Sequence, residues 1–209
     1  QKKFNFYLLG GDLSSSKFLT ISSTFFGISK KNKIMPQNTV NLDDDIWITG
    51  NIGDSYVGLQ FLKKKLKLDY TSKNFFLKKY FYPNACIYGF VVAEYANAMK
   101  DISDGFLSDL KKMLNNKYGA EVSLKTIPLS SNLRKLVNNK IIKYDNILNS
   151  GDNYELIIIA GKKFRQKIHS IAKRNKLKIS RVGKVTQKKE IIFDSKKPLI
   201  IPREFDHFL

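Results

Sequence analysis

A strand, a turn and a helix start follow one another directly in the segment Ile46-Trp47-Ile48-Thr49-Gly50-Asn51-Ile52-Gly53-Asp54. Its first four residues are apolar or β-branched, which predicts a short buried strand. The two glycines then turn the chain, and Asp54 or Ser55 can cap the helix that follows. That helix ends near Lys63-Lys64-Lys65, where positive charge suits the C-terminal end of the helix dipole. The segment therefore predicts a fold in which strands alternate with helices.

The alternation continues to the end of the chain. Leu156–Ala160 is a nearly uninterrupted apolar run, which is typical of a central strand buried on both faces. Residues 104–116 carry apolar side chains at spacings of three and four, which favours an amphipathic helix. The other elements that we expect are helices at 87–99 and 164–174 and strands at 177–182 and 191–193. We therefore predict an α+β domain that spans residues 41–209.

The chain before this domain has a different pattern. Residues 4–9 and 18–28 are rich in β-forming apolar residues and predict two strands. The polar stretch 29–45 that follows predicts a crossover, and we expect its three aspartates, at 43–45, to be solvated. Because the chain starts inside a predicted strand, we expect residues 1–40 to be the remnant of an earlier N-terminal domain.

The chain is strongly basic, with a formal net charge of +19 over 209 residues. Such a charge is also typical of a non-catalytic nucleic-acid-binding domain, which gains affinity by neutralising phosphates. The lysines are scattered along the chain, however, and only five residues are arginine, the better bidentate ligand of bases and phosphates. A compositional bias toward lysine is the simpler explanation, so we expect no nucleic-acid partner.

Cysteine and histidine are too rare for several classes of site. Cys86 is the only cysteine, so no disulfide can form within the chain, and His169 and His207 alone do not make a Cys/His zinc site. No apolar run approaches the roughly 20 residues that span a bilayer. We therefore expect a cytoplasmic protein without a membrane partner.

Carboxylates lie at three points where the chain is expected to change direction. They are Asp12 after Gly10-Gly11, Asp101 and Asp104 in Asp-Ile-Ser-Asp-Gly, and Asp152 with Glu155 in Gly-Asp-Asn-Tyr-Glu. Oxygen ligands without neighbouring histidine or cysteine suit Mg²⁺ and a polyphosphate better than zinc.

The segment from Asp101 to Gly105 has two interpretations of equal weight. Alternation in an extended chain would place Asp101 and Ser103 on one face, where they and Asp104 converge on one ion and one phosphate. Alternatively, Ser103 or Asp104 only caps the following helix, and the other polar groups are solvated.

Five segments, in this order, resemble the motifs of thiamine-monophosphate kinases. They are Leu9-Gly10-Gly11-Asp12 (GGDT), Thr49-Gly50-Asn51-Ile52-Gly53-Asp54-Ser55 (TGxxGDS), Asp101-Ile102-Ser103-Asp104-Gly105 (D(I/L)SDG), Ser150-Gly151-Asp152-Asn153-Tyr154-Glu155-Leu156 (GG(E/D)DYEL) and Phe205-Asp206-His207-Phe208 (aromatic-x-HF). Each motif is weak alone, but five ordered matches spread over the whole chain make chance similarity improbable.

The resemblance implies the C-terminal α/β-sandwich domain of the aminoimidazole ribonucleotide synthetase-like superfamily, preceded by the last strands of a barrel-forming N-terminal domain. It implies an enzyme that uses ATP and Mg²⁺ to phosphorylate thiamine monophosphate by direct in-line transfer, as a homodimer when full length. The residue roles that it implies are ATP contacts for Gly11, Asp12, Gln37 and Ser103, Mg²⁺ ligation by Asp12, Asp101 and Asp104, and thiamine contacts for Asp152 and Phe205.

Three positions depart from the resembled motifs. Leu13 stands in place of a threonine, Gln37 stands near the position of an ATP-contacting arginine, and Asn153 alters an acidic pair. The N-terminal segment that carries further aspartates in the resembled family does not precede Gln1, so we expect the chain alone to be inactive or nearly so. Another ATP-using enzyme of the same superfamily, similar to aminoimidazole ribonucleotide synthetase, is the alternative assignment.

Overall fold

The computed structural model describes residues 6–28, 39–84, 86 and 89–194 of the chain. The chain divides into two compact units, Gln1–Lys31 and Asn32–Leu209. The predicted domain division into 1–40 and 41–209 stays a prediction.

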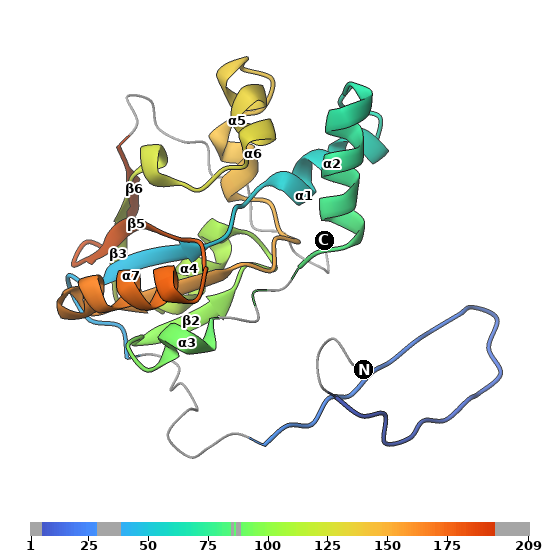
Figure 1. Ribbon diagram of the computed structural model, residues 1–209, viewed down its shortest axis with the longest axis horizontal. Helices are drawn as coiled ribbons and strands as arrows, with labels where there is room; N and C mark the ends of the chain where they lie inside the picture. Colours follow the sequence, from blue (N-terminus) through green and yellow to red (C-terminus); the bar gives the residue numbers. More distant parts are fainter. Residues whose placement is uncertain (1–5, 29–38, 85, 87–88, 195–209) are drawn as a thin grey trace. The chain divides into compact units, whose positions relative to one another are not determined.

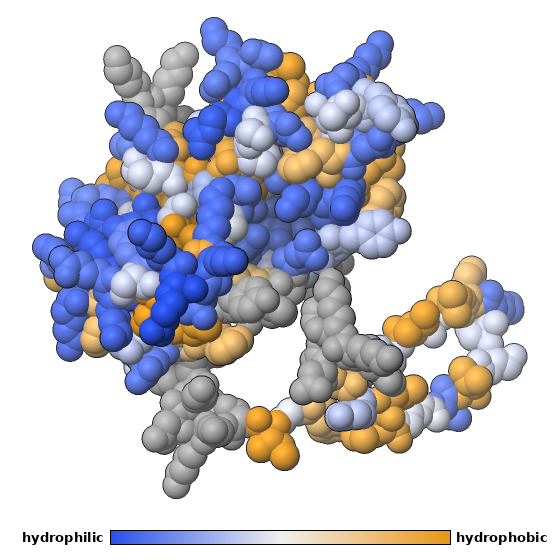
Figure 2. Space-filling view, in the orientation of Figure 1, coloured by the Kyte–Doolittle hydropathy of each residue, from blue (hydrophilic) through white to orange (hydrophobic). Residues whose placement is uncertain are grey.

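The first unit contains no helix or strand among its described residues 6–28. The rings of Phe6 and Phe25 nevertheless meet edge to face, with centroids 5.9 Å apart at 82°. The two segments therefore approach each other without forming a hydrogen-bonded ladder, and the strands predicted at 4–9 and 18–28 are wrong for the described residues. An apolar β pattern gives a strand only where a neighbouring strand satisfies its backbone groups. Apolar side chains such as Leu13 and Phe26 remain exposed in this unit. Figure 2 shows several hydrophobic stretches on its surface.

The second unit is built on a six-stranded sheet with the strand order β2-β4-β1-β5-β3-β6 (Figure 1). The strands are β1 (Asp45–Thr49), β2 (Ala98–Asp101), β3 (Gly119–Val122), β4 (Leu156–Ala160), β5 (Ile179–Thr186) and β6 (Ile191–Phe193). All paired neighbours are antiparallel except β3 and β6, which are parallel. The predicted central position of the 156–160 strand is confirmed, because β4 lies between β2 and β1.

Helices cover the sheet on both faces (Figure 1). They are α1 (Asp54–Leu62), α2 (Tyr70–Phe81), α3 (Phe90–Ala93), α4 (Phe106–Leu114), α5 (Ser131–Asn138), α6 (Tyr144–Leu148) and α7 (Arg165–Arg174), with short 3₁₀ helices η2 (Leu124–Thr126) and η3 (Lys162–Phe164). Within the described residues, no helix is both long enough and apolar enough to cross a bilayer.

The side chains of β1 and β4 alternate between two apolar cores. Trp47 and Ile158 pair across the two strands and pack against Ile168 of α7 in the smaller core. Ile46 and Ile48 point to the opposite face, into the larger core that α1, α4, α5 and α6 help to build. All five side chains are fully buried, and each such side chain stabilises the fold by about 1.5–3 kcal/mol. This two-sided burial explains why Ile46–Ile48 of β1 and the whole of β4 are apolar.

The helix predicted at 87–99 is wrong in its second half. Among the described residues 89–99 only α3 is helical, and Ala98–Asp101 forms strand β2 along the edge of β4. The N–H of Asn97 already donates to the carbonyl of Ile159 at 2.7 Å. Pairing with the open edge of β4 thus overrides the local helical pattern, as tertiary contacts commonly do.

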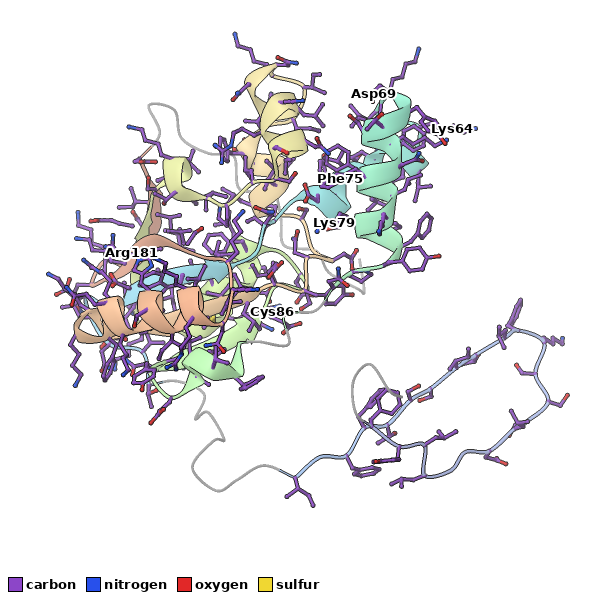
Figure 3. The ribbon with its side chains drawn as sticks, viewed as in Figure 1. Lys64, Asp69, Phe75, Lys79, Cys86 and Arg181 are labelled. Carbon is purple, nitrogen blue, oxygen red and sulfur yellow. The ribbon has the colours of Figure 1, made fainter. Side chains whose placement is uncertain are left out.

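The expectation of a solvated aspartate run at 43–45 is wrong for Asp44 and Asp45, which are buried, whereas Asp43 is exposed. The side chain of Asp45 is 1% exposed and accepts hydrogen bonds from Arg165, at 2.7 Å from both Nε and Nη2, and from Nε of Arg181 at 2.6 Å (Figure 3 labels Arg181). Burial raises the pKa of Asp45, but the bonds and charges of the two guanidinium groups outweigh it and hold the pKa below its ordinary value. Asp45 of β1 therefore holds α7 against the sheet through its ion pair with Arg165.

Candidate functional site

The main candidate site is a pocket of about 760 Å³ in the second unit, lined by α1, α6 and the loops before α4 and β4. Ser103, Asp104 and Asp152, three of the residues singled out from the sequence, line it together. The other lining residues are Ser55, Tyr56, Leu59, Gln60, Lys63, Tyr80, Asp145, Asn146, Asn149, Ser150, Gly151 and Tyr154. The volume is in the usual range for sites that bind small molecules.

The loop at 101–105 is shaped by a carboxylate that the sequence analysis did not single out. The backbone N–H groups of Ser103 and Asp104 both donate to Oδ2 of Asp109, each at 3.1 Å. Asp109 lies in the first turn of α4 and is fully buried, and its Oδ1 lies 3.3 Å from Nζ of Lys100. The cap predicted at Ser103 or Asp104 is therefore wrong: the residue before α4 is Gly105, which makes no side-chain cap.

In this loop the side chains of Asp101 and Asp104 lie in different surroundings. Asp104 lines the pocket and pairs with Nζ of Lys112 at 2.6 Å. Asp101 ends β2 with an exposed side chain, 3.8 Å from Nζ of Lys100, and does not line the pocket. Ser103 and Asp104 thus meet at the pocket as the first interpretation expected, but Asp101 does not line it, so the expected convergence of all three residues is not seen.

The loop before β4 is hydrogen-bonded to the same segment. The N–H of Asp152 donates to the carbonyl of Ser103 at 3.0 Å. The N–H of Tyr154 donates to the carbonyl of Ile102 at 3.0 Å, and the N–H of Ile102 donates to the carbonyl of Glu155 at 2.8 Å. At Gly151 an added Cβ would lie 2.1 Å from the carbonyl oxygen of Ser103, so this close approach requires glycine. Two motifs that are about 50 residues apart therefore form one wall of the pocket.

A third motif, the turn at 49–55, joins them through side chains. Oγ1 of Thr49 donates to the carboxylate of Glu155 at 2.7 Å, and the N–H of Gly53 donates to Oδ1 of Asn153 at 2.7 Å. Gly53 has φ = 89° and itself precedes α1 without a side-chain cap. The predicted cap by Asp54 or Ser55 is wrong, because both side chains contact other segments. Ser55 lies within 3.4 Å of Gly151 and Asn153.

The comparison with known proteins agrees with this arrangement. The family described as AIR synthase related protein, C-terminal domain, matches residues 43–196. The chain belongs to this family. The predicted superfamily is thereby confirmed, and the matched residues include all three segments that build the pocket wall.

The resemblance of this AIR synthase related chain to thiamine-monophosphate kinases is also confirmed. The thiamine-monophosphate kinase of Buchnera aphidicola subsp. Schizaphis graminum is 38% identical over 215 residues, which is 99% of this chain and 65% of that protein. The crystal structure of thiamine-monophosphate kinase from Stenotrophomonas maltophilia K279a matches with a TM-score of 0.68 and 25% identity, over 79% of this chain and 54% of that one. A structure of AaThiL complexed with AMPPCP and TMP has the same TM-score at 23% identity, over 82% of this chain and 53% of that one. The chain thus spans less than two thirds of these proteins.

Behind the pocket wall, the AIR synthase related domain holds two further carboxylates, the buried Asp54 and the half-buried Glu155. Asp54 is 4% exposed and accepts a bond from Oγ of Ser130 at 2.6 Å, while its Oδ2 has no hydrogen-bond partner among the described residues. Burial raises the pKa of Asp54 and of Glu155, and the positive charges of Lys79 and Lys178 partly oppose that rise. Burial likewise lowers the pKa of Lys178. Lys79 projects from α2 (Figure 3) and lines a small cavity of about 40 Å³ together with both carboxylates.

The remaining predicted site residues belong to other parts of the chain. Gly11 and Asp12 belong to the first unit, where Asp12 accepts a bond from Oγ of Ser14 at 3.5 Å. Gln37 and Phe205 lie outside the described residues. The roles implied for these residues stay predictions.

The donors at the pocket fit Mg²⁺ bound to phosphates better than a closed metal cage. In the described part of the chain, no three histidine, cysteine or acidic side chains are grouped as a metal site. Asp104, Asp145 and Asp152 nevertheless line the same pocket, and all supply hard oxygen ligands. Mg²⁺ typically uses one or two protein carboxylates and completes its shell with water and substrate phosphates.

Proposed function

We propose that the protein to which this chain belongs transfers the γ-phosphoryl group of ATP to thiamine monophosphate and so forms thiamine diphosphate. The observation that carries the proposal is the meeting of Ser103, Asp104 and Asp152 at one pocket of suitable size. The names of the similar proteins support it, as does the AMPPCP and TMP complex of AaThiL, since AMPPCP has the phosphate chain of ATP with a methylene in its last bridge.

This phosphoryl transfer requires the protein mainly to position the two substrates. A phosphate acceptor is already anionic near neutral pH, so its oxygen can attack the γ-phosphorus without a strong general base. The new P–O bond forms in line as the bond to the β-phosphate breaks and ADP leaves. Positioning and charge neutralisation then supply the rate enhancement. The pocket suits this step, because the described residues that line it include aspartates and serines and none of them is a cysteine or histidine.

Mg²⁺ is the cofactor that we assign to this reaction, where it would neutralise charge on the transferring phosphates. Asp104 would hold it at the pocket. The motifs also imply Mg²⁺ ligation by Asp101 and Asp12, and these two roles stay predictions. Gly11, Gln37 and Ser103 would contact ATP, and Asp152 and Phe205 would contact the thiamine moiety. We further propose that the complete protein is a cytoplasmic homodimer.

The proposal is tested by incubating the complete protein with γ-labelled ATP, Mg²⁺ and a panel of acceptors. The panel contains thiamine monophosphate, thiamine and the ribonucleotide substrate of an aminoimidazole ribonucleotide synthetase. We expect the label in thiamine diphosphate alone. Label released as inorganic phosphate only with the ribonucleotide would instead assign the protein to the alternative enzyme of the superfamily.

A further inference from the structure

The side chain of Asn153 makes hydrogen bonds in two directions from the pocket wall. Its Oδ1 accepts from the N–H of Gly53 at 2.7 Å, directly before α1. Its Nδ2 donates to the carbonyl oxygens of Ser150 and Gly151, at 2.8 and 3.1 Å. One half-buried amide therefore ties the start of α1 to the two residues that precede Asp152.

Only an amide satisfies this set of partners. The Gly53 N–H requires an acceptor, and the two carbonyls require a donor, so the oxygen and nitrogen of the side chain are fixed by their neighbours. An aspartate would keep the bond to Gly53 but would place a second carboxylate oxygen against two carbonyl oxygens. An apolar side chain of the same size would lose these three bonds and also the longer one, 3.4 Å, that Oδ1 accepts from Oγ of Ser55.

The backbone around Asn153 needs such a tie. Asp152 and Tyr154, on either side of it, have φ values of 57° and 52°, in the left-handed region that non-glycine residues seldom adopt. On its other side, the loop is held by backbone bonds from Asp152 and Asn153 to Ser103 and Ile102, at 3.0 and 3.2 Å. The Asn153 amide closes the loop on the side of α1, so the direction of the exposed Asp152 side chain depends on both attachments.

We infer that Asn153 is a positioning residue that sets the place of Asp152, and with it the affinity of the pocket for the phosphate acceptor. The predicted change in affinity for the phosphate acceptor rests on the proposed function. The hydrogen bonds that Asn153 makes to the two segments do not depend on it. Asn153 acts through Asp152 and the turn at Gly53 and need not touch a substrate.

The test uses two variants of the complete protein, Asn153→Asp and Asn153→Leu, with Asn175→Asp as the matched control. The Asn175 amide also donates to a backbone carbonyl, that of Ile171 at 2.8 Å, but at the end of α7 on the opposite face of the sheet. Two quantities are measured: the separate KM values for thiamine monophosphate and ATP, and the hydrogen exchange rates of peptides that cover residues 50–56 and 150–155.

We expect KM for thiamine monophosphate to rise about tenfold in both variants, the effect of about one lost hydrogen bond, with KM for ATP within about twofold of its normal value. Exchange at 150–155 should accelerate in both variants, but exchange at 50–56 only in Asn153→Leu. The control should change neither. Unchanged exchange in both variants overturns the tie, and an equal rise of both KM values overturns the positioning role. An inactive parent protein would refute the proposed function, while the exchange rates would still decide the tie.

Discussion

Oγ of Ser130 lies 2.6 Å from Oδ1 of Asp54 and donates a hydrogen bond to it. The same hydroxyl oxygen accepts the N–H of Leu133 at 3.1 Å and so caps α5. Both side chains are buried, at 7% and 4% exposure. One hydroxyl group thus links the first residue of α1, and with it the pocket wall, to the start of α5.

Replacing Ser130 with alanine should therefore remove a helix cap and a bond to a buried carboxylate at once. We expect Ser130→Ala to lower the free energy of unfolding by about 2 kcal/mol. Urea denaturation measures the change, and Ser170→Ala is the control because the exposed Ser170 hydroxyl bonds only to a carbonyl of its own helix. Equal stabilities of the two variants would show that the Ser130 link contributes nothing.

The raised pKa of Asp54 has a consequence for the pH dependence of stability. A carboxyl group whose pKa is higher in the folded state binds more protons there, so its contribution to stability falls as pH rises from its ordinary pKa through the raised one. Asp54→Asn cannot ionise and keeps an oxygen for Ser130. We expect this variant to gain stability relative to the parent as pH rises across that window. Urea titrations from pH 4 to neutrality give the difference, and a constant or decreasing difference would contradict the burial of a raised-pKa carboxyl.

The parts of the fold that sequence predicted well are those with strong local patterns. The apolar run of β4 and the three- and four-residue spacing of apolar side chains in α4 were each enough to predict the element, because burial produces such patterns directly. Helix α2 was not predicted, since only Phe76 among its residues is buried and its apolar stripe is weak. The cap that Asp69 forms with the N–H of Ser72 was the available signal for its start.

Gly50 is required by its conformation and by its neighbour. Its φ is 55°, and an added Cβ would lie 1.8 Å from Oε1 of Glu155, which would have to leave Thr49. We expect Gly50→Ala to lower the free energy of unfolding by more than about 1 kcal/mol. In Gly161→Ala, where the nearest atoms are 3.8 Å from the new Cβ, the change should stay within about 0.5 kcal/mol. Thermal melts compare the two, and the reverse order would refute the close contact of Gly50 with Glu155.

Asp45 provides a separate test of how α7 is attached. Removing its charge leaves Arg165 and Arg181 without their shared carboxylate, so we expect Asp45→Asn to lower the melting temperature by about 5 °C at pH 7. Because the pKa of Asp45 is below its ordinary value, its stabilising contribution is present above that ordinary value and is lost as pH falls through the lowered pKa. The variant and the parent should therefore converge in acid. A difference that grows in acid would contradict the ion-pair assignment.

The candidate site was predictable in its residues but not in its connections. The motifs around Ser103, Asp104 and Asp152 were visible in the sequence, and the structure brings these three to one pocket. Asp109 and Asn153 fix the loops through backbone partners, and a side-chain–backbone bond between distant segments leaves no spacing in the sequence to detect. For the same reason, Asp54 was predicted to be a helix cap although it bonds to Ser130 on another helix.

The most direct measurement is the rate at which the complete protein forms thiamine diphosphate when Asp104 is changed to asparagine, at saturating ATP and Mg²⁺. Asp104→Asn also breaks an exposed pair with Lys112, which costs at most about 1 kcal/mol of stability. Glu121→Gln breaks a comparable exposed pair, with Lys184 on β5, and is the control. We predict that kcat falls at least about a hundredfold in Asp104→Asn and stays near normal in Glu121→Gln. Parent-like turnover in Asp104→Asn would contradict the assignment of phosphoryl transfer to this pocket.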